Sequence, residues 1–246
     1  MTDFVVVIPA RYASTRLSGK PLREINGKPM LQHVYERGAE SQASEVVIAT
    51  DDERIADAAE SFGATVCMTG EHHESGTERI AEVSDVLGWG EEQIVVNLQG
   101  DEPAMPATLI DECAALLDDP RADIATLASP MASQKDFENP NVVKAVVDQS
   151  GYALYFSRAA IPYARSGYNT GLALESARHH HGIYAYRCGV LRRLVDADPS
   201  PLELCEQLEQ LRALSLGFTI RVAVPSVRPG PGVDTEDDLL AAAAAL

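Results

Sequence analysis

The sequence is poor in basic residues, and lysine is the scarcer of the two. Its 20 lysines and arginines face 37 acidic residues, which gives a formal net charge of −17 at pH 7, and only four of the 20 are lysines. Nucleic acids and anionic membranes bind proteins through basic surfaces. We therefore exclude nucleic acid and membrane surfaces as partners, and any local cluster of basic residues becomes conspicuous.

Cysteine and long apolar runs are also scarce. The four cysteines, Cys67, Cys113, Cys188 and Cys205, are widely spaced and form no CxxC pair, so structural zinc is not expected. Scattered cysteines in apolar surroundings are typical of buried free thiols in a reducing cytosol. No apolar run approaches the roughly 18 residues of a membrane span. Asp3 precedes a first apolar run that is too short for a secretory leader, so we expect a cytoplasmic protein.

The chain carries enough apolar side chains for one large α/β domain. It has 246 residues, of which 46% are hydrophobic, and it shows no repeat or linker, so we predict one domain over residues 1–246. Apolar runs alternate with amphipathic segments, which predicts a doubly wound, mostly parallel sheet with helices on both faces. The predicted strands cover residues 4–10, 45–50, 65–68, 93–99, 124–127, 180–186 and 218–224. The predicted helices cover residues 29–37, 51–59, 77–87, 106–117, 189–195, 201–216 and the C-terminal segment.

An antiparallel insertion interrupts this alternation after residue 140. Two β-rich runs, residues 142–147 and 152–156, flank a turn that contains Gly151, which predicts a hairpin. Residues 167–177 contain glycine and asparagine and predict a loop. In the helix predicted over residues 201–216, the core-facing stripe consists of Leu204, Leu208 and Leu211.

The first strand runs into the most basic stretch of the chain. Residues 9–22 contain Arg11, Arg16 and Lys20 among small side chains. In α/β proteins, backbone N–H groups and cations in the loop after a buried strand hold phosphates. This loop has neither the GxxxxGK[ST] order of a P-loop nor the GxGxxG order of a dinucleotide fold. It therefore predicts a phosphate loop of another kind, and a solvated basic loop is the plainer alternative.

Two acidic positions could hold a metal ion beside those phosphates. Asp101 follows the strand predicted over residues 93–99, at the edge where parallel sheets bind ligands. Carboxylates there can hold Mg²⁺ against triphosphate oxygens, and Asp234 is the second candidate ligand. Each has a structural alternative. An aspartate after a strand can form a turn, and Thr235 and Asp238 have the spacing of a helix capping box.

Polar residues elsewhere predict contacts to the rest of a substrate. Residues 75–79 combine hydroxyls and an arginine at the start of a helix, so they could read a base edge or only cap the helix. Glu206, Glu209 and Gln210 share one face of the predicted helix, and a solvated face is the alternative, which we favour for Glu206. The polar residues after residue 150 that could bind a second substrate are Arg158, His180, Tyr184, Tyr186, Glu206, Glu209, Gln210 and Arg212.

Together, these motifs resemble the 3-deoxy-manno-octulosonate cytidylyltransferases, also called CMP-KDO synthetases. The matching stretches are collinear and extend over nearly the whole chain: residues 7–17, 19–22, 75–79, 97–103, 152–158, 182–184 and 232–235. The resemblance implies a Rossmann-like nucleotidyltransferase fold with an inserted antiparallel hairpin and dimerisation region at about residues 140–190. It also implies CTP, Mg²⁺, a homodimer and a cytoplasmic step of bacterial lipopolysaccharide synthesis.

The resemblance further implies roles for individual residues. The catalytic residues would be Arg11, Lys20, Asp101 and Asp234, and the two aspartates would bind Mg²⁺. The nucleotide would contact Ala10, Arg11, Ser14, Lys20, Ser75, Gly76, Arg79 and Gln99. The sugar acid would contact Arg158, His180, Tyr184, Glu209 and Gln210.

Three positions depart from the family pattern. Ser18 stands where the family usually has proline, which predicts a looser loop without the loss of a ligand. His179 and His181 stand where arginine and an apolar residue are usual. Spacing alone therefore does not say which of His179, His180 and His181 faces the substrate. Residues 164–177 match the family weakly and could help to set which sugar is accepted.

The implied reaction is attack by the anomeric hydroxyl of an eight-carbon 2-keto-3-deoxy sugar acid on the α-phosphorus of CTP, with pyrophosphate as the leaving group. The nearest alternative substrates are the 8-amino analogue of that acid and a nine-carbon sialic-type acid. A nucleotidyltransferase for sugar 1-phosphates is disfavoured because the first loop lacks a GxGxR arrangement. A non-catalytic nucleotide-binding regulator is disfavoured because Arg11, Lys20, Asp101 and Asp234 are all present.

Overall fold

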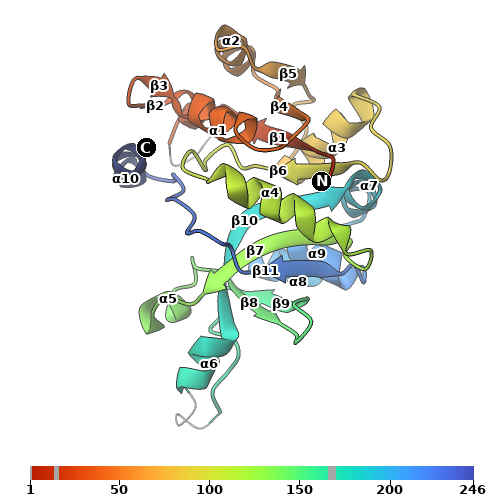
Figure 1. Ribbon diagram of the computed structural model, residues 1–246, viewed down its shortest axis with the longest axis vertical. Coiled ribbons are helices and arrows are strands. Elements are labelled where there is room, and N and C mark those ends of the chain that lie inside the picture. Colours follow the sequence, from red (N-terminus) through yellow and green to blue (C-terminus); the bar gives the residue numbers. More distant parts are fainter. Residues whose placement is uncertain (1, 14–16, 166–169) are drawn as a thin grey trace.

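A computed structural model describes residues 2–13, 17–165 and 170–246, and most of its strands join in one sheet (Figure 1). The strands are β1 (Phe4–Ala10), β2 (Glu24–Ile25), β3 (Lys28–Pro29), β4 (Glu45–Thr50), β5 (Thr65–Met68), β6 (Ile94–Asn97), β7 (Ile124–Pro130), β8 (Lys144–Val147), β9 (Ala153–Ser157), β10 (Ala177–Arg187) and β11 (Ile220–Ala223). The main path of the sheet is β11-β7-β10-β6-β1-β4-β5. Along it, β10 runs antiparallel to β6 and β7, and the other six strands share one direction. The predicted mostly parallel fold is confirmed.

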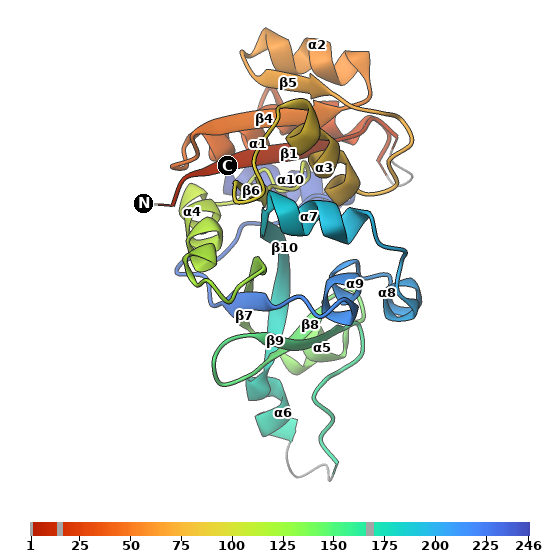
Figure 2. The same cartoon turned by 90° about the vertical axis from the view of Figure 1, so that its right-hand side faces the viewer.

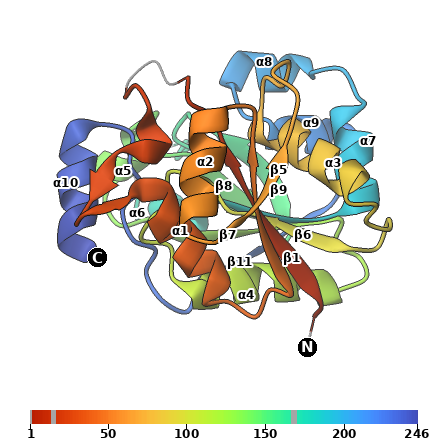
Figure 3. The ribbon, with the colours of Figure 1, turned by 90° about the horizontal axis from the view of Figure 1, so that it is seen from above.

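Helices cover both faces of the sheet, as Figure 3 shows from above. The helices are α1 (Met30–Ala39), α2 (Glu53–Ser61), α3 (Gly76–Val86), α4 (Ala107–Ala115), α5 (Gln134–Glu138), α6 (Thr170–Ser176), α7 (Cys188–Val195), α8 (Pro201–Glu206), α9 (Gln210–Ser215) and α10 (Glu236–Ala245), with short 3₁₀ turns at Lys20–Leu22 and Leu116–Asp118. Within the described ranges, no helix has the length and apolar character needed to cross a bilayer.

Strand β1 is apolar throughout because it is buried on both faces. Val6 and Ile8 pack in one core cluster with side chains of α1, α2 and α4. Val5 and Val7 point the opposite way into a second cluster, with side chains of α3, α7 and α9. Successive strand residues alternate between faces, so a continuous apolar run supplies both cores. This is why the sequence of β1 predicts a central strand.

The two strands that carry the predicted phosphate loop and the first predicted metal ligand lie side by side. β1 pairs with β6 in parallel, with Val7 opposite Asn97, so the segments that follow both strands emerge at the same edge of the sheet. Gly100 comes so close to β1 that an added Cβ would lie 2.9 Å from the carbonyl oxygen of Pro9. The small residue at position 100 therefore allows the two loops to meet.

The predicted hairpin is confirmed, and the loop predicted next to it is wrong. β8 and β9 pair antiparallel around the turn that contains Gly151, whose φ of 82° suits glycine. Residues predicted as a loop over 167–177 include helix α6, at the far end of β10 from α7 (Figure 2). Gly171 favoured the prediction of a loop, but the three residues that follow it, Leu172, Ala173 and Leu174, are good helix formers.

The single helix predicted over residues 201–216 is also wrong, because the chain turns at Gln207. Gln207 adopts a left-handed φ of 51° between α8 and α9. The carbonyl oxygen of Glu206, which would accept from residue 210 in a continuous helix, instead accepts from Nε of Arg158 at 2.7 Å. Leu208 and Leu211 are buried as predicted, but Leu204 is 66% exposed and does not belong to the core.

The four cysteines are free, as predicted. Cys67, Cys113 and Cys188 are buried, and burial raises the pKa of each of these thiols. Cys205 is exposed, so the expectation of burial is wrong for this residue.

Candidate active site

A cavity of about 640 Å³ opens where the loops after β1 and β6 meet. It is lined by every predicted nucleotide-binding and metal-binding residue within the described chain: Ala10, Arg11, Lys20, Ser75, Gly76, Arg79, Gln99, Asp101 and Asp234. Ser14, the remaining predicted contact, lies outside the described residues. The cavity brings together residues that are more than 200 positions apart in the sequence.

The ammonium group of Lys20 lies between the two predicted metal ligands. Its Nζ donates to Asp101 Oδ2 at 2.8 Å and to Asp234 Oδ1 at 3.0 Å. Burial lowers the pKa of Lys20, but the two carboxylates outweigh it and raise the pKa above its ordinary value. Lys20 therefore holds the two carboxylates close together, as two ligands of one metal ion must be.

The acidic neighbour Glu102 is largely uncharged at neutral pH. Burial, followed by repulsion from Asp101, raises the pKa of Glu102 to about 8. The carboxylates of Asp101 and Asp234 suit Mg²⁺, which is often held by one or two carboxylates together with substrate phosphates. The donor set therefore fits a metal that is shared with a bound nucleotide.

The helix-capping roles that the sequence left open are filled by Ser75 itself and, beside Asp234, by Thr235 and Asp238. Thr235 and Asp238 form the predicted capping box at the start of α10, with Asp234 immediately before it. The Ser75 hydroxyl caps α3 by accepting from the Glu78 amide at 3.2 Å. Capping fixes each loop end on a rigid helix, and the cavity is lined by Ser75 itself and by Asp234, which directly precedes the cap Thr235. At these positions the structural and the functional interpretations are compatible.

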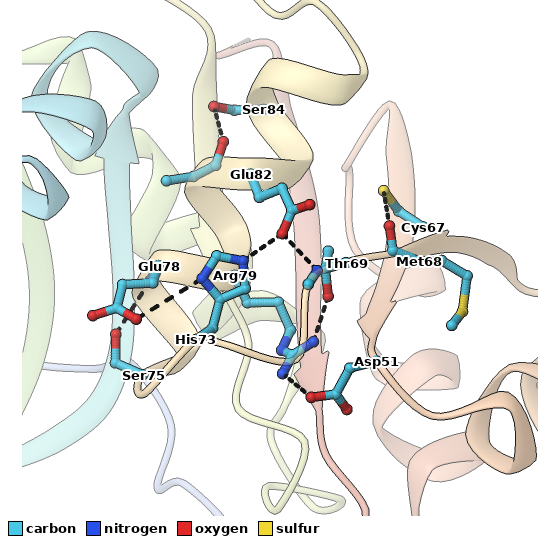
Figure 4. A network of polar contacts seen from close by, with 12 residues as sticks. Asp51, Cys67, Met68, Thr69, His73, Ser75, Glu78, Arg79, Glu82 and Ser84 are labelled. Carbon is cyan, nitrogen blue, oxygen red and sulfur yellow. Dashed lines mark hydrogen bonds and ion pairs between the residues drawn. The ribbon is translucent and has the colours of Figure 1, made fainter.

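Arg79 is the most deeply buried of the cavity residues that carry a charge. It is 3% exposed, and its guanidinium donates to the Thr69 hydroxyl and, at 2.7 Å, to Asp51 Oδ2 (Figure 4). These contacts tie the start of α3 to the ends of β4 and β5. Arg79 therefore shapes the wall of the cavity in addition to lining it.

A second cavity has a volume of about 320 Å³. Gln99 lines both cavities, so the second adjoins the first. Four of the five residues predicted to bind the sugar acid line it: His180, Tyr184, Glu209 and Gln210. The buried atoms Tyr184 Oη, Glu209 Oε1 and Gln210 Nε2 have no hydrogen-bond partner within the described chain. Buried polar atoms without partners are costly, so this cavity is suited to a ligand rich in hydroxyl or carboxylate groups.

Comparison with known proteins identifies the family. The pattern of the family described as cytidylyltransferase matches residues 5–220. The chain belongs to the cytidylyltransferase family. It is also similar to a solved structure of a CMP:2-keto-3-deoxy-manno-octonic acid synthetase complexed with CTP, with 42% identity, a TM-score of 0.88, and coverage of 98% of this chain and 97% of the other. The predicted resemblance is thereby confirmed.

Two further solved structures share the fold of this cytidylyltransferase. A cytidylyltransferase from Leptospira borgpetersenii serovar Hardjo-bovis is 16% identical with a TM-score of 0.61, over 97% of this chain and 83% of the other. A 4-diphosphocytidyl-2C-methyl-D-erythritol synthase is 15% identical with a TM-score of 0.65, over 100% of this chain and 99% of the other. At this identity the likeness concerns the fold alone.

Arg158, the fifth predicted sugar contact, is not among the described residues that line the second cavity. Its guanidinium binds the carbonyl oxygens of Glu206, Pro140 and Gln207 at 2.7, 3.2 and 3.4 Å. The solvated face favoured for Glu206 is wrong, since its carboxylate accepts from the Ser157 hydroxyl at 2.6 Å and the Arg158 amide at 2.8 Å. Arg158 and Glu206 therefore fasten the turn between α8 and α9 to the end of β9.

The three neighbouring histidines have different surroundings. His179 and His180 line the second cavity, and His180 Nε2 lies 3.2 Å from the Thr126 hydroxyl. His181 Nε2 lies 2.7 Å from the Ser129 hydroxyl. Burial lowers the pKa of His180 to about 3, and burial and His179 lower the pKa of His181 to about 4. All of this points to neutral His180 and His181 rings at pH 7.

The histidines should make the stability of this cytidylyltransferase depend on pH. When the pH falls from 6.5 to 5, His181 gains a proton more readily in the unfolded chain than in the folded one, so the free energy of unfolding falls. We expect His181 to contribute about 1–2 kcal/mol of this loss. Urea unfolding at pH 7 and pH 5 should show a smaller loss for His181→Leu than for the wild type. An equal loss in both proteins would contradict the assignment.

Several residues that line the cavities were not predicted as site residues. His73 and Tyr12 line the first cavity, and Asn97 lines the second. His73 lies just before the predicted segment 75–79, so its position along the chain was the available signal. Tyr12 packs with its ring 3.1 Å from the position of a Cβ added to Gly19, a contact within the phosphate loop that spacing alone does not reveal.

Proposed function

We propose that the chain is a 3-deoxy-manno-octulosonate cytidylyltransferase, which converts CTP and the eight-carbon sugar acid into CMP-KDO and pyrophosphate. The observation that carries the proposal is the pair of adjoining cavities with Gln99 in the wall of both. The first offers cations and carboxylates, as a metal-bound triphosphate requires, and the second offers buried polar atoms without partners. The 42% identity to a CTP-bound synthetase, over almost the whole of both chains, supports this assignment.

In this mechanism the protein orients two substrates and stabilises the charge that develops between them. Arg11 and Lys20 bind the triphosphate and stabilise the departing pyrophosphate. His180, Tyr184, Glu209 and Gln210 hold the sugar acid so that its anomeric hydroxyl faces the α-phosphorus, in line with the leaving group. Orientation of the two bound reactants and electrostatic stabilisation together account for most of the catalysis in such a reaction. No cysteine and no covalent enzyme intermediate is needed.

Asp101 and Asp234 are the residues that would hold Mg²⁺. When bound there, the ion neutralises triphosphate oxygens and lowers the pKa of a coordinated hydroxyl. Lys20 now contacts both carboxylates, so its ammonium keeps them close together, and a nucleotide would offer it phosphate oxygens as alternative partners.

The assay of pyrophosphate release tests the proposed function. The purified protein should release pyrophosphate from CTP and Mg²⁺ in the presence of KDO, and not in its absence. The 8-amino analogue of KDO and a sialic-type acid should be much poorer substrates. If one of those acids gave a higher kcat/KM than KDO, the chemistry would stand and the assigned substrate would be wrong.

Replacement of Tyr184 with phenylalanine should separate substrate binding from stability. Removal of the hydroxyl should raise the KM for KDO about tenfold, since a hydrogen bond to the substrate is lost. The melting temperature should not fall, because Tyr184 Oη is buried without a partner in the described chain. Steady-state kinetics and thermal unfolding measure the two effects. A lower melting temperature with an unchanged KM would indicate a structural role instead.

We also infer that the enzyme is a cytoplasmic homodimer that contributes to lipopolysaccharide synthesis, as the family resemblance implies. Large apolar side chains in the region of residues 140–190 support an interface there. Leu154, Tyr163 and Leu172 are 61%, 84% and 61% exposed in the single chain. Light scattering coupled to gel filtration should give the mass of two chains, and a single-chain mass would contradict the dimer.

A further inference from the structure

The loop between β5 and α3 forms one wall of the first cavity. His73, Glu74, Ser75 and Gly76 are four consecutive residues that line it. Arg11, Lys20, Asp101 and Asp234 provide the charged part of the same cavity. If the phosphates of a nucleotide bind that charged part, the loop is the polar wall that remains for the base.

Two carboxylates of α3, one helical turn apart, hold this loop. Glu82 Oε2 accepts from the Gly70 amide at 2.9 Å and also contacts Nε2 of His73 (Figure 4). Glu78 Oε2 accepts from the Glu74 amide at 2.8 Å and lies 3.8 Å from Nδ1 of His73. The imidazole of His73 thus lies between two acidic side chains, and both ends of the loop are fastened to the helix.

Glu82 is the member of this group that acts from outside the cavity. It is not among the described residues that line the cavity, but it binds both the start of the loop and the ring of a lining residue. Burial raises the pKa of Glu82, but the hydrogen bonds from His73 and Gly70 outweigh it and lower the pKa below its ordinary value. Glu82 is therefore ionised at neutral pH and holds His73 by a charge-assisted contact.

A binding site distinguishes cytosine from uracil only if its hydrogen-bonding groups are held in fixed positions. The two bases carry opposite donors and acceptors at adjacent ring positions. A site built to hydrogen-bond one pattern leaves its own groups unpaired with the other. That penalty is realised only if the groups in the wall cannot shift, and binding geometry must be held to within about 0.5 Å.

We infer that Glu82 is a positioning residue for the nucleotide base, which fixes His73 and the loop after β5 so that the cavity accepts CTP and rejects UTP. The inference rests on the proposed function only in taking a nucleotide as the ligand of the first cavity. It assigns the choice of base to a side chain that does not itself contact the ligand. It also explains why two like charges stand one turn apart on α3, an arrangement that otherwise costs stability.

The test compares equilibrium binding of CTP and UTP, by calorimetry with Mg²⁺ and without any sugar acid. In Glu82→Ala, we expect the ratio of the UTP and CTP dissociation constants to fall about tenfold, because the hydrogen-bonding wall is no longer fixed. The matched control is Asp85→Ala. Asp85 lies on the same helix and pairs with Arg192 at 2.6 Å, away from the loop, so this variant should keep the wild-type ratio.

A ratio in folded Glu82→Ala that stays within about twofold of the wild type would overturn the role of Glu82. This holds even if both nucleotides bind more weakly, since a merely structural role weakens both alike. If Glu82→Ala does not fold, Glu82→Gln removes the charge with the same shape and is judged by the same ratio. A wild type that binds CTP but forms no CMP-sugar would overturn the proposed function and leave this inference standing, whereas a wild type that does not bind CTP would overturn both.

Discussion

Asp101→Asn is expected to lower kcat by about a thousandfold, because the variant loses a carboxylate that we propose as a ligand of the metal beside the triphosphate. Asp101 lies beside the phosphate loop with Lys20 Nζ at 2.8 Å. Asparagine has nearly the same shape but cannot neutralise a cation. The effect should therefore appear in pyrophosphate release at saturating CTP and KDO. Asp234→Asn should have an effect of similar size.

The same substitution should leave the fold almost unchanged. Asp101 is 40% exposed, and Lys20 keeps Asp234 as a partner at 3.0 Å. Partly exposed ion pairs contribute up to about 1 kcal/mol to the free energy of unfolding. As a control, Asp57→Asn changes an exposed aspartate of α2 and should affect neither kcat nor stability. Wild-type kcat in Asp101→Asn with Mg²⁺ would contradict the metal assignment.

Arg212→Met is expected to produce the largest loss of stability. Arg212 is 6% exposed and donates to both carboxylate oxygens of Glu203, at 2.8 and 2.6 Å. It also donates to the carbonyl oxygens of Leu194 and Ala197. Without it, Glu203 would remain buried with an uncompensated charge, which costs about 3–5 kcal/mol. Urea unfolding should show this loss as a lower midpoint at an unchanged m-value.

A surface arginine provides the comparison for Arg212. Arg121 pairs with Asp119, but its side chain is 67% exposed, so Arg121→Met should cost no more than about 1 kcal/mol. Arg212 also stabilises the segment that carries Glu209 and Gln210 into the second cavity. Where Arg212→Met remains folded, its KM for KDO should rise while its KM for CTP stays near the wild-type value. Equal losses of stability in the two arginine variants would contradict the buried-pair interpretation.

The parts of the fold that were predictable are those set by local patterns. The apolar run of β1 has one conformation that buries both of its faces, and strand pairing then brings Asp101 to the phosphate loop. Helix starts were predictable where a capping residue stands in the sequence, as at Ser75 and Thr235. Together, these features allowed most of the residues that line the first cavity to be predicted from the sequence.

The errors arise from contacts between distant residues. The helix predicted over residues 201–216 breaks because Arg158, almost 50 positions earlier, takes the carbonyl of Glu206. Glu206 itself looked solvated because its partner Ser157 lies on another element. The environment of His181 depends on Ser129, 52 positions away on a neighbouring strand. Such pairs have no periodic signal, so the sequence of either member alone does not reveal them.

In the proposed reaction, the enzyme binds CTP and KDO in the two adjoining cavities and joins KDO to the α-phosphorus of CTP. The most direct measurement is ³¹P NMR of a reaction that contains the protein, CTP, Mg²⁺ and KDO. We predict that the triphosphate signals are replaced by a phosphodiester signal and a pyrophosphate signal that grow together, one of each per CTP consumed. Appearance of CDP with inorganic phosphate, or of free CMP without a phosphodiester, would contradict the account.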